Sequence, residues 1–97
     1  MSSFVARYKN SKRYLEGFHA GNMSNFISIK SSGWINFSSL DDASEYFYYM
    51  YQTLLGIKRD DEDKKVAAQK DINNLSKFEI LEIKDKKIIN IFEPTYL

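Results

Sequence analysis

The 97-residue sequence contains no cysteine, a single histidine, one proline and four glycines. Without cysteine the chain has no disulfides, thiolate metal ligands or cysteine nucleophiles. His19 alone cannot complete a zinc site, so we expect neither a metal nor a cofactor. The scarcity of proline and glycine argues against a linker or a disordered tail. The chain is therefore expected to fold, with its stability coming from packing.

Long apolar runs and a charge excess of one sign are also missing. No apolar run approaches the roughly 18 residues of a membrane span, and the Met1-Ser2-Ser3 start lacks the basic and apolar regions of a signal peptide. We therefore expect no membrane contact and a cytoplasmic location. The net charge of +1, from 14 basic and 13 acidic residues, predicts neither a strong nucleic-acid binder nor an acidic nucleic-acid mimic. The length fits one domain over residues 1–97.

Motifs for catalysis are lacking as well. His19 has no serine in an elbow motif to serve, and Gly17 and Gly21 have no phosphate-loop spacing around them. The acidic pairs and runs at residues 41–42 and 60–63 sit where helix starts favour negative charge, which explains them without catalysis. We expect a protein that is not an enzyme.

The N-terminal half reads as short strands. Turn-favouring clusters at residues 10–11 and 31–33 separate alternating segments. A strand starting at Phe4 should pair with residues 13–18 as a hairpin, and residues 18–25 read as a loop. Further strands are expected at residues 26–30 and 34–37, the latter with Trp34 on the face opposite Ile35 and Phe37.

A helix is predicted from Leu40 to Leu55. Ser39 is a capping residue followed by two carboxylates, and Gly56 is a natural left-handed stop. At 100° per residue, one stripe forms the core face. That stripe contains Ala43, Phe47, Met50 and Leu54, with Leu40, Tyr46 and Tyr51 at its edges.

The predicted helix carries five aromatic rings within residues 46–51. Tyr48 and Tyr49 project away from the core stripe, beside Glu45 and Gln52. Solvent-facing helix positions usually hold Lys, Glu or Gln, so two explanations compete. Either the second helix or the sheet covers these rings, or they form an exposed patch for a protein partner.

The C-terminal half predicts a second helix and a β-hairpin. Residues 60–75 are mostly helix formers, with Ala68, Ile72 and Leu75 on one face. Residues 78–83 and 88–92 should pair around a turn at Asp85 and Lys86. Both faces of this hairpin are apolar, which favours a place inside the sheet. The expected fold is α+β: a small antiparallel sheet against one main amphipathic helix, with a second short helix and the C-terminal hairpin.

The basic N-terminal hairpin gives an alternative site. Arg7, Lys9, Lys12 and Arg13 interleave with tyrosines, as in sheets that bind single strands. A solvated outer face explains the same pattern, because Arg7 and Lys9 lie opposite Tyr8 on the first strand. Nucleic acid is therefore the less favoured partner, and a small nucleic-acid-binding regulator is the alternative function.

The segments Gly33-Trp34, Phe37 to Ala43 and Phe78 to Ile83 resemble those of small accessory proteins of phages and prophages of Gram-positive bacteria. This group includes inhibitors of host defence, among them anti-CRISPR proteins, which act by binding. The resemblance implies a host or phage protein as partner, such as an RNA-guided nuclease complex, met in the host cytoplasm. The leading hypothesis is thus a protein-binding inhibitor that uses Tyr48, Tyr49, Glu45 and Gln52, a face that could equally form a homodimer.

Overall fold

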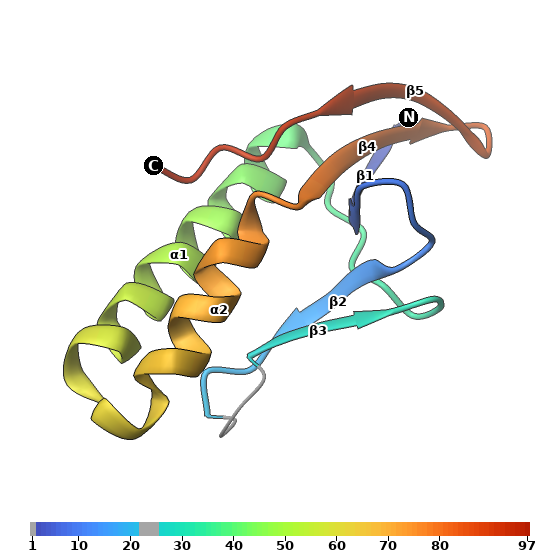
Figure 1. Ribbon diagram of the computed structural model, residues 1–97. Helices are drawn as coiled ribbons and strands as arrows, with labels where there is room; N and C mark the ends of the chain where they lie inside the picture. The colour runs from blue at the N-terminus through green and yellow to red at the C-terminus, as the bar shows by residue number, and fades with distance from the viewer. Residues whose placement is uncertain (1, 22–25) are drawn as a thin grey trace.

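The computed structural model describes residues 2–21 and 26–97, and shows two helices packed on one side of an antiparallel sheet (Figure 1). The predicted α+β class is confirmed. The helices are α1 (Leu40–Asp60) and α2 (Lys65–Leu75), with a short 3₁₀ turn, η1 (Glu62–Lys64), between them. The strands are β1 (Ser3–Tyr8), β2 (Tyr14–Phe18), β3 (Ile27–Lys30), β4 (Phe78–Lys84) and β5 (Lys87–Phe92), in the order β3-β2-β1-β4-β5. Residues 22–25 of the predicted loop lie outside the described residues.

The centre of the sheet is the antiparallel pair β1 and β4, which is in register from Ser3 opposite Ile83 to Tyr8 opposite Phe78. Because successive side chains alternate between faces, Ala6 and Ile80 point toward the helices and Val5 and Leu81 point away. The helix-facing side of these strands belongs to the main core. Val5 and Leu81 are nevertheless fully buried on the opposite face.

Helix α1 begins as predicted, because the Ser39 hydroxyl accepts a hydrogen bond of 3.0 Å from the Asp42 backbone N–H. Its buried residues are the predicted stripe, Ala43, Phe47, Met50 and Leu54. The Phe47 ring meets Phe78 of β4 edge-on, with ring centroids 5.5 Å apart. This contact joins the helix layer to the central strand.

The prediction that Gly56 ends α1 is wrong, since the helix runs on to Asp60 and the cap N–H of Asp61 bonds to the carbonyl of Ile57. Glycine costs an interior helix position about 0.5–1 kcal/mol relative to alanine. Ile57 packs against the core, and its burial offsets that cost. The second helix also starts later than predicted, at Lys65, after the 3₁₀ turn.

The helix α2 fastens the strand β3 through a buried carboxylate. Asp71 is 6% exposed, and its Oδ2 accepts hydrogen bonds from the backbone N–H groups of Phe26, at 3.0 Å, and Ile27, at 3.3 Å. These donors lie at the start of the edge strand β3. Asp71 therefore satisfies backbone groups that the sheet edge would leave unpaired.

The C-terminal hairpin forms around the predicted turn, because Asp85 and Lys86 both adopt positive φ and Ile83 pairs with Ile88. The expected interior position holds only for β4. The strand β5 is the other edge of the sheet, and it exposes its isoleucines. Periodicity alone could not show this, because an apolar pattern on both faces does not identify which strand of a pair meets a further neighbour.

The segment after β3 is not the expected strand at residues 34–37. Phe37 forms a single bridge to Phe4, and the Ile35 N–H bonds to the Leu15 carbonyl at 3.0 Å. The predicted faces are nevertheless confirmed: Ile35 and Phe37 join the core, and Trp34 stacks on Tyr14 on the other side. The segment is wedged between β1 and β2, which share only a short ladder near the turn.

Replacing Phe47 tests the helix phase. Phe47→Ala should reduce the free energy of unfolding by about 3–5 kcal/mol, because it removes a fully buried ring and leaves a cavity. Chemical denaturation measures this loss. Val66→Ala on the exposed side of α2 is the control and should change stability by less than about 0.5 kcal/mol. Equal midpoints for the two variants would show that the helix phase is wrong.

Replacing Asp71 tests the link between α2 and β3. Asp71→Ala should cost about 2–3 kcal/mol, because two backbone donors lose a charged acceptor. Asp71→Asn keeps one acceptor oxygen and should cost less. Amide hydrogen exchange should show lost protection at Phe26 and Ile27 in the alanine variant. Unchanged protection there would remove the carboxylate from the account of this edge.

Replacing Gly56 tests whether helix α1 continues through this position. A Cβ at Gly56 would meet only the end of the Arg59 side chain, at 3.9 Å, so Gly56→Ala should stabilise the protein by about 0.5–1 kcal/mol. Gly33→Ala is the contrast, because Gly33 has φ +77° and the substitution there should destabilise. A lower melting temperature for Gly56→Ala would restore Gly56 as the helix end.

Candidate functional site

The outward side of α1 presents four residues that we name the outer stripe: Glu45, Tyr48, Tyr49 and Gln52. All four are exposed, with 51% of Tyr48 and 52% of Tyr49 accessible to solvent. Their spacing of three, four and seven residues places them on one side of the helix, opposite Phe47 and Met50. Of the two explanations left open by the sequence, the structure favours exposure, because neither ring is buried under α2.

Tyr49 is held in place by other rings. Its ring meets Phe18 edge-on at 5.7 Å and lies 6.1 Å from Tyr46, which in turn packs on Phe37 at 5.5 Å. Burial raises the pKa of the Tyr46 hydroxyl above its ordinary value, so this supporting ring stays neutral at physiological pH. The exposed half of Tyr49 is therefore presented from a fixed aromatic support.

Tyr48 lies on the other flank, where α1 meets the C-terminal segment. A shallow hollow of about 280 Å³ lies there, lined by Ser44, Glu45, Tyr48, Thr95, Tyr96 and Leu97. Tyr96 packs on Tyr51 with ring centroids 5.2 Å apart, which ties the segment to the helix. The hollow can accept a side chain, with Glu45 as a hydrogen-bond acceptor and Tyr48 as an apolar wall.

The four cations of the predicted basic hairpin are not brought together. The Arg7 Nε donates to Glu79 Oε2 at 2.7 Å on the sheet face away from the helices. That bond holds the pKa of Arg7 above its usual value. Lys9 pairs with Glu93 at 2.9 Å. Only Lys12 and Arg13 remain as exposed cations without a carboxylate partner among the described residues.

Sequence reasoning missed a second group of cations, which lie along α2. Lys70 and Lys77 line hollows together with Arg13 of the β1–β2 turn and with Asn74. These residues are more than 50 positions apart in the sequence, from Arg13 to Lys77, and they meet only because α2 lies beside β1 and β2. No local pattern in the sequence signals this arrangement.

The described residues offer little for catalysis. His19 is exposed at the rim of a polar hollow that also includes Arg13 and Asp71. Across residues 2–21 and 26–97, no three His, Cys, Asp or Glu side chains are grouped so that they could hold a metal ion. Neither α1 nor α2, the two α-helices of this part of the chain, combines the length and apolarity needed to cross a membrane.

Comparison with known proteins finds no matching family model, no similar curated protein and no similar solved structure. These comparisons neither support nor oppose the resemblance to phage accessory proteins. The candidate site therefore rests on the geometry of the outer stripe.

Proposed function

We propose that the protein is a non-enzymatic binding module that docks on another protein through the outer stripe of α1. The observation that supports this most is the pair of half-exposed rings, Tyr48 and Tyr49, on a helix whose other side is fully buried. Tyrosine is enriched at protein interfaces because it offers a large apolar surface together with a hydroxyl group.

The stripe is suited to binding because little order has to be gained on association. Tyr49 already rests on Phe18 and Tyr46, and the C-terminal segment is already packed beside Tyr48. Immobilising a flexible side chain costs about 0.5–1.5 kcal/mol, and rings held before binding avoid part of that cost. Glu45 and Gln52 give the two rings a polar rim.

We further propose inhibition as the biological outcome, by occlusion of a host defence nuclease in the manner of an anti-CRISPR protein. This finer proposal is based on the sequence resemblance in residues 33–34, 37–43 and 78–83. The net charge of +1 supports contact with protein rather than imitation of DNA. A homodimer through the outer stripe is the competing use of the same surface.

The double substitution Tyr48→Ala, Tyr49→Ala tests the stripe. Each ring at the centre of an interface carries about 2 kcal/mol or more, so affinity should fall by a factor of several hundred. Stability should stay within about 1–2 kcal/mol of the wild type, because only the contacts of Tyr49 with Phe18 and Tyr46 are lost. The measurements are thermal unfolding, and calorimetric titration of a partner captured from bacterial lysate by the wild-type protein.

Val66→Ala is the matched control, because Val66 is an exposed apolar residue on the other helix. It should leave both binding and stability unchanged. Sedimentation of the free protein distinguishes a homodimer, which the double substitution should dissociate. The proposal fails if the double variant binds the captured partner as tightly as the control, or if it unfolds like Phe47→Ala.

A further inference from the structure

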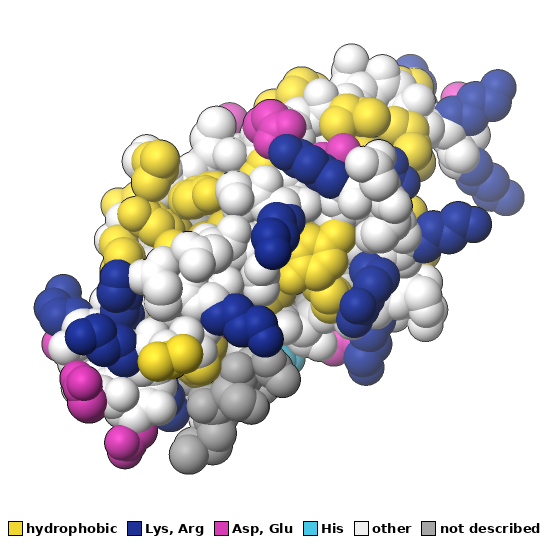
Figure 2. Space-filling view, in the orientation of Figure 1, with side chains coloured by type: hydrophobic (Ala, Val, Ile, Leu, Met, Phe, Trp, Pro, Cys, Tyr) yellow, Lys and Arg dark blue, Asp and Glu magenta, His cyan; other side chains and the backbone are white. Residues whose placement is uncertain are grey.

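The face formed by α2 and its neighbouring strands carries a run of hollows that we name the α2 groove. Three hollows of about 440, 640 and 410 Å³ adjoin one another, and all three are lined by Asn74. Figure 2 shows Lys and Arg side chains spread over this face. The cations that line the groove are Lys9, Arg13, Lys58, Lys65, Lys70 and Lys77.

The charge of the α2 groove is almost entirely positive. Its one lining carboxylate is Asp71, which is nearly buried and accepts hydrogen bonds from the Phe26 and Ile27 backbone. Within the described part of the chain, Arg13, Lys70 and Lys77 form no ion pair with a carboxylate. Three cations at the centre of the groove are thus available to an anionic ligand.

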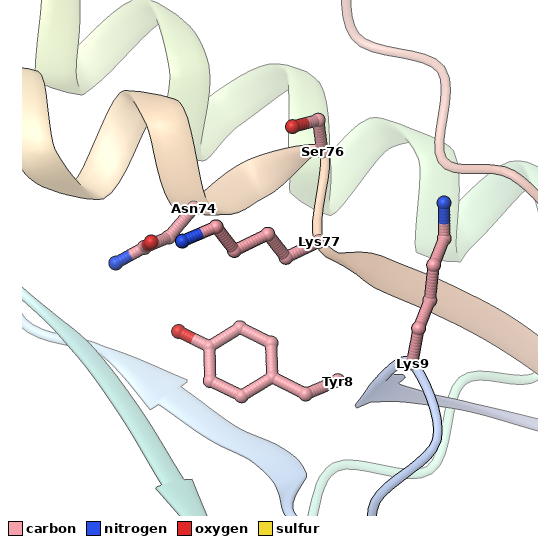
Figure 3. Close-up of a pocket in the computed structure, with 5 residues that line it drawn as sticks. All are labelled: Tyr8, Lys9, Asn74, Ser76 and Lys77. Carbon is pink, nitrogen blue, oxygen red and sulfur yellow. The ribbon is translucent and has the colours of Figure 1, made fainter.

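The polar groups between these cations suit phosphate oxygens. Figure 3 shows the Tyr8 hydroxyl directed toward the end of the hollow where Asn74 and the Lys77 ammonium lie. Burial raises the pKa of the Tyr8 hydroxyl, and the Asp71 carboxylate adds to the shift, so the hydroxyl remains a neutral donor. Hydroxyl, amide and ammonium donors in a row are the groups with which proteins contact nucleic-acid backbones.

The α2 groove has no free aromatic face for stacking bases. The ring of Tyr8 packs on Phe78 with centroids 4.4 Å apart. Single-strand binders that hold bases do so on exposed rings, and such a platform is lacking among the described lining residues. Recognition here would therefore be of backbone charge, without preference for base sequence.

We propose that the α2 groove binds the phosphodiester backbone of nucleic acid. The 11 residues of α2 span about 16 Å at 1.5 Å per residue, which matches four or five phosphates at about 3.4 Å spacing along one strand of a duplex. Of the hairpin cations considered from sequence, the groove includes Lys9 and Arg13 but not Arg7 or Lys12. The site is independent of the outer stripe, which lies on the other helix.

Fluorescence anisotropy with labelled duplex DNA, single-stranded DNA and duplex RNA tests this proposal. For about four phosphate contacts, the logarithm of the affinity should fall with the logarithm of salt concentration with a slope of about −4. Lys70→Glu, Lys77→Glu should weaken binding at least about tenfold at low salt and make the slope shallower by about 2. Both side chains are exposed, and circular dichroism should show an unchanged fold.

The control is Lys84→Glu, Lys86→Glu, which makes the same charge change at the β4–β5 turn. It should leave the slope unchanged and alter the affinity by less than about twofold at moderate salt. Equal losses in the two variants would attribute binding to net charge and overturn the groove. Absence of binding to all three nucleic acids at low salt would overturn it as well, and tighter binding of inorganic polyphosphate would assign the groove to a different phosphate polymer.

Discussion

The contact between Phe47 of α1 and Phe78 of β4 is the interaction on which the rest of the structure depends. β4 is paired with both β1 and β5, so a helix fixed to it is fixed to the centre of the sheet. A helix turns 100° per residue, and burying Phe47 therefore determines where each following side chain points. Tyr48 and Tyr49 are turned outward by the same rotation that buries Met50. The core contact and the candidate binding surface are two results of one helix phase.

The parts of the fold that sequence predicted are those set by local chemistry. The Ser39 cap, the stripe from Ala43 to Leu54 and the turn at Asp85 and Lys86 each depend on residues close together in the chain. The errors concern long-range packing. Gly56 stays helical because Ile57 reaches the core, and β5 is an edge because nothing pairs beyond it in the described residues.

The surfaces divide in the same way. Periodicity placed Tyr48 and Tyr49 outside the core stripe, but whether another element covered them depended on how α2 packs, and that is a tertiary question. The basic hairpin looked like one site, yet Glu79 and Glu93 pair with Arg7 and Lys9 from distant strands. The α2 groove was not predictable, because Arg13 meets Lys70 and Lys77 only in the folded chain.

The central claim is that α1 buries one side and leaves the tyrosines of its other side open to solvent in the isolated protein. Tyrosine nitration followed by peptide mass spectrometry measures this residue by residue. The account predicts fast modification of Tyr48 and Tyr49, and slow modification of Tyr8 and Tyr46, whose rings pack on Phe78 and Phe37. Protection of Tyr48 and Tyr49 to the level of Tyr8 in the monomeric protein would contradict it.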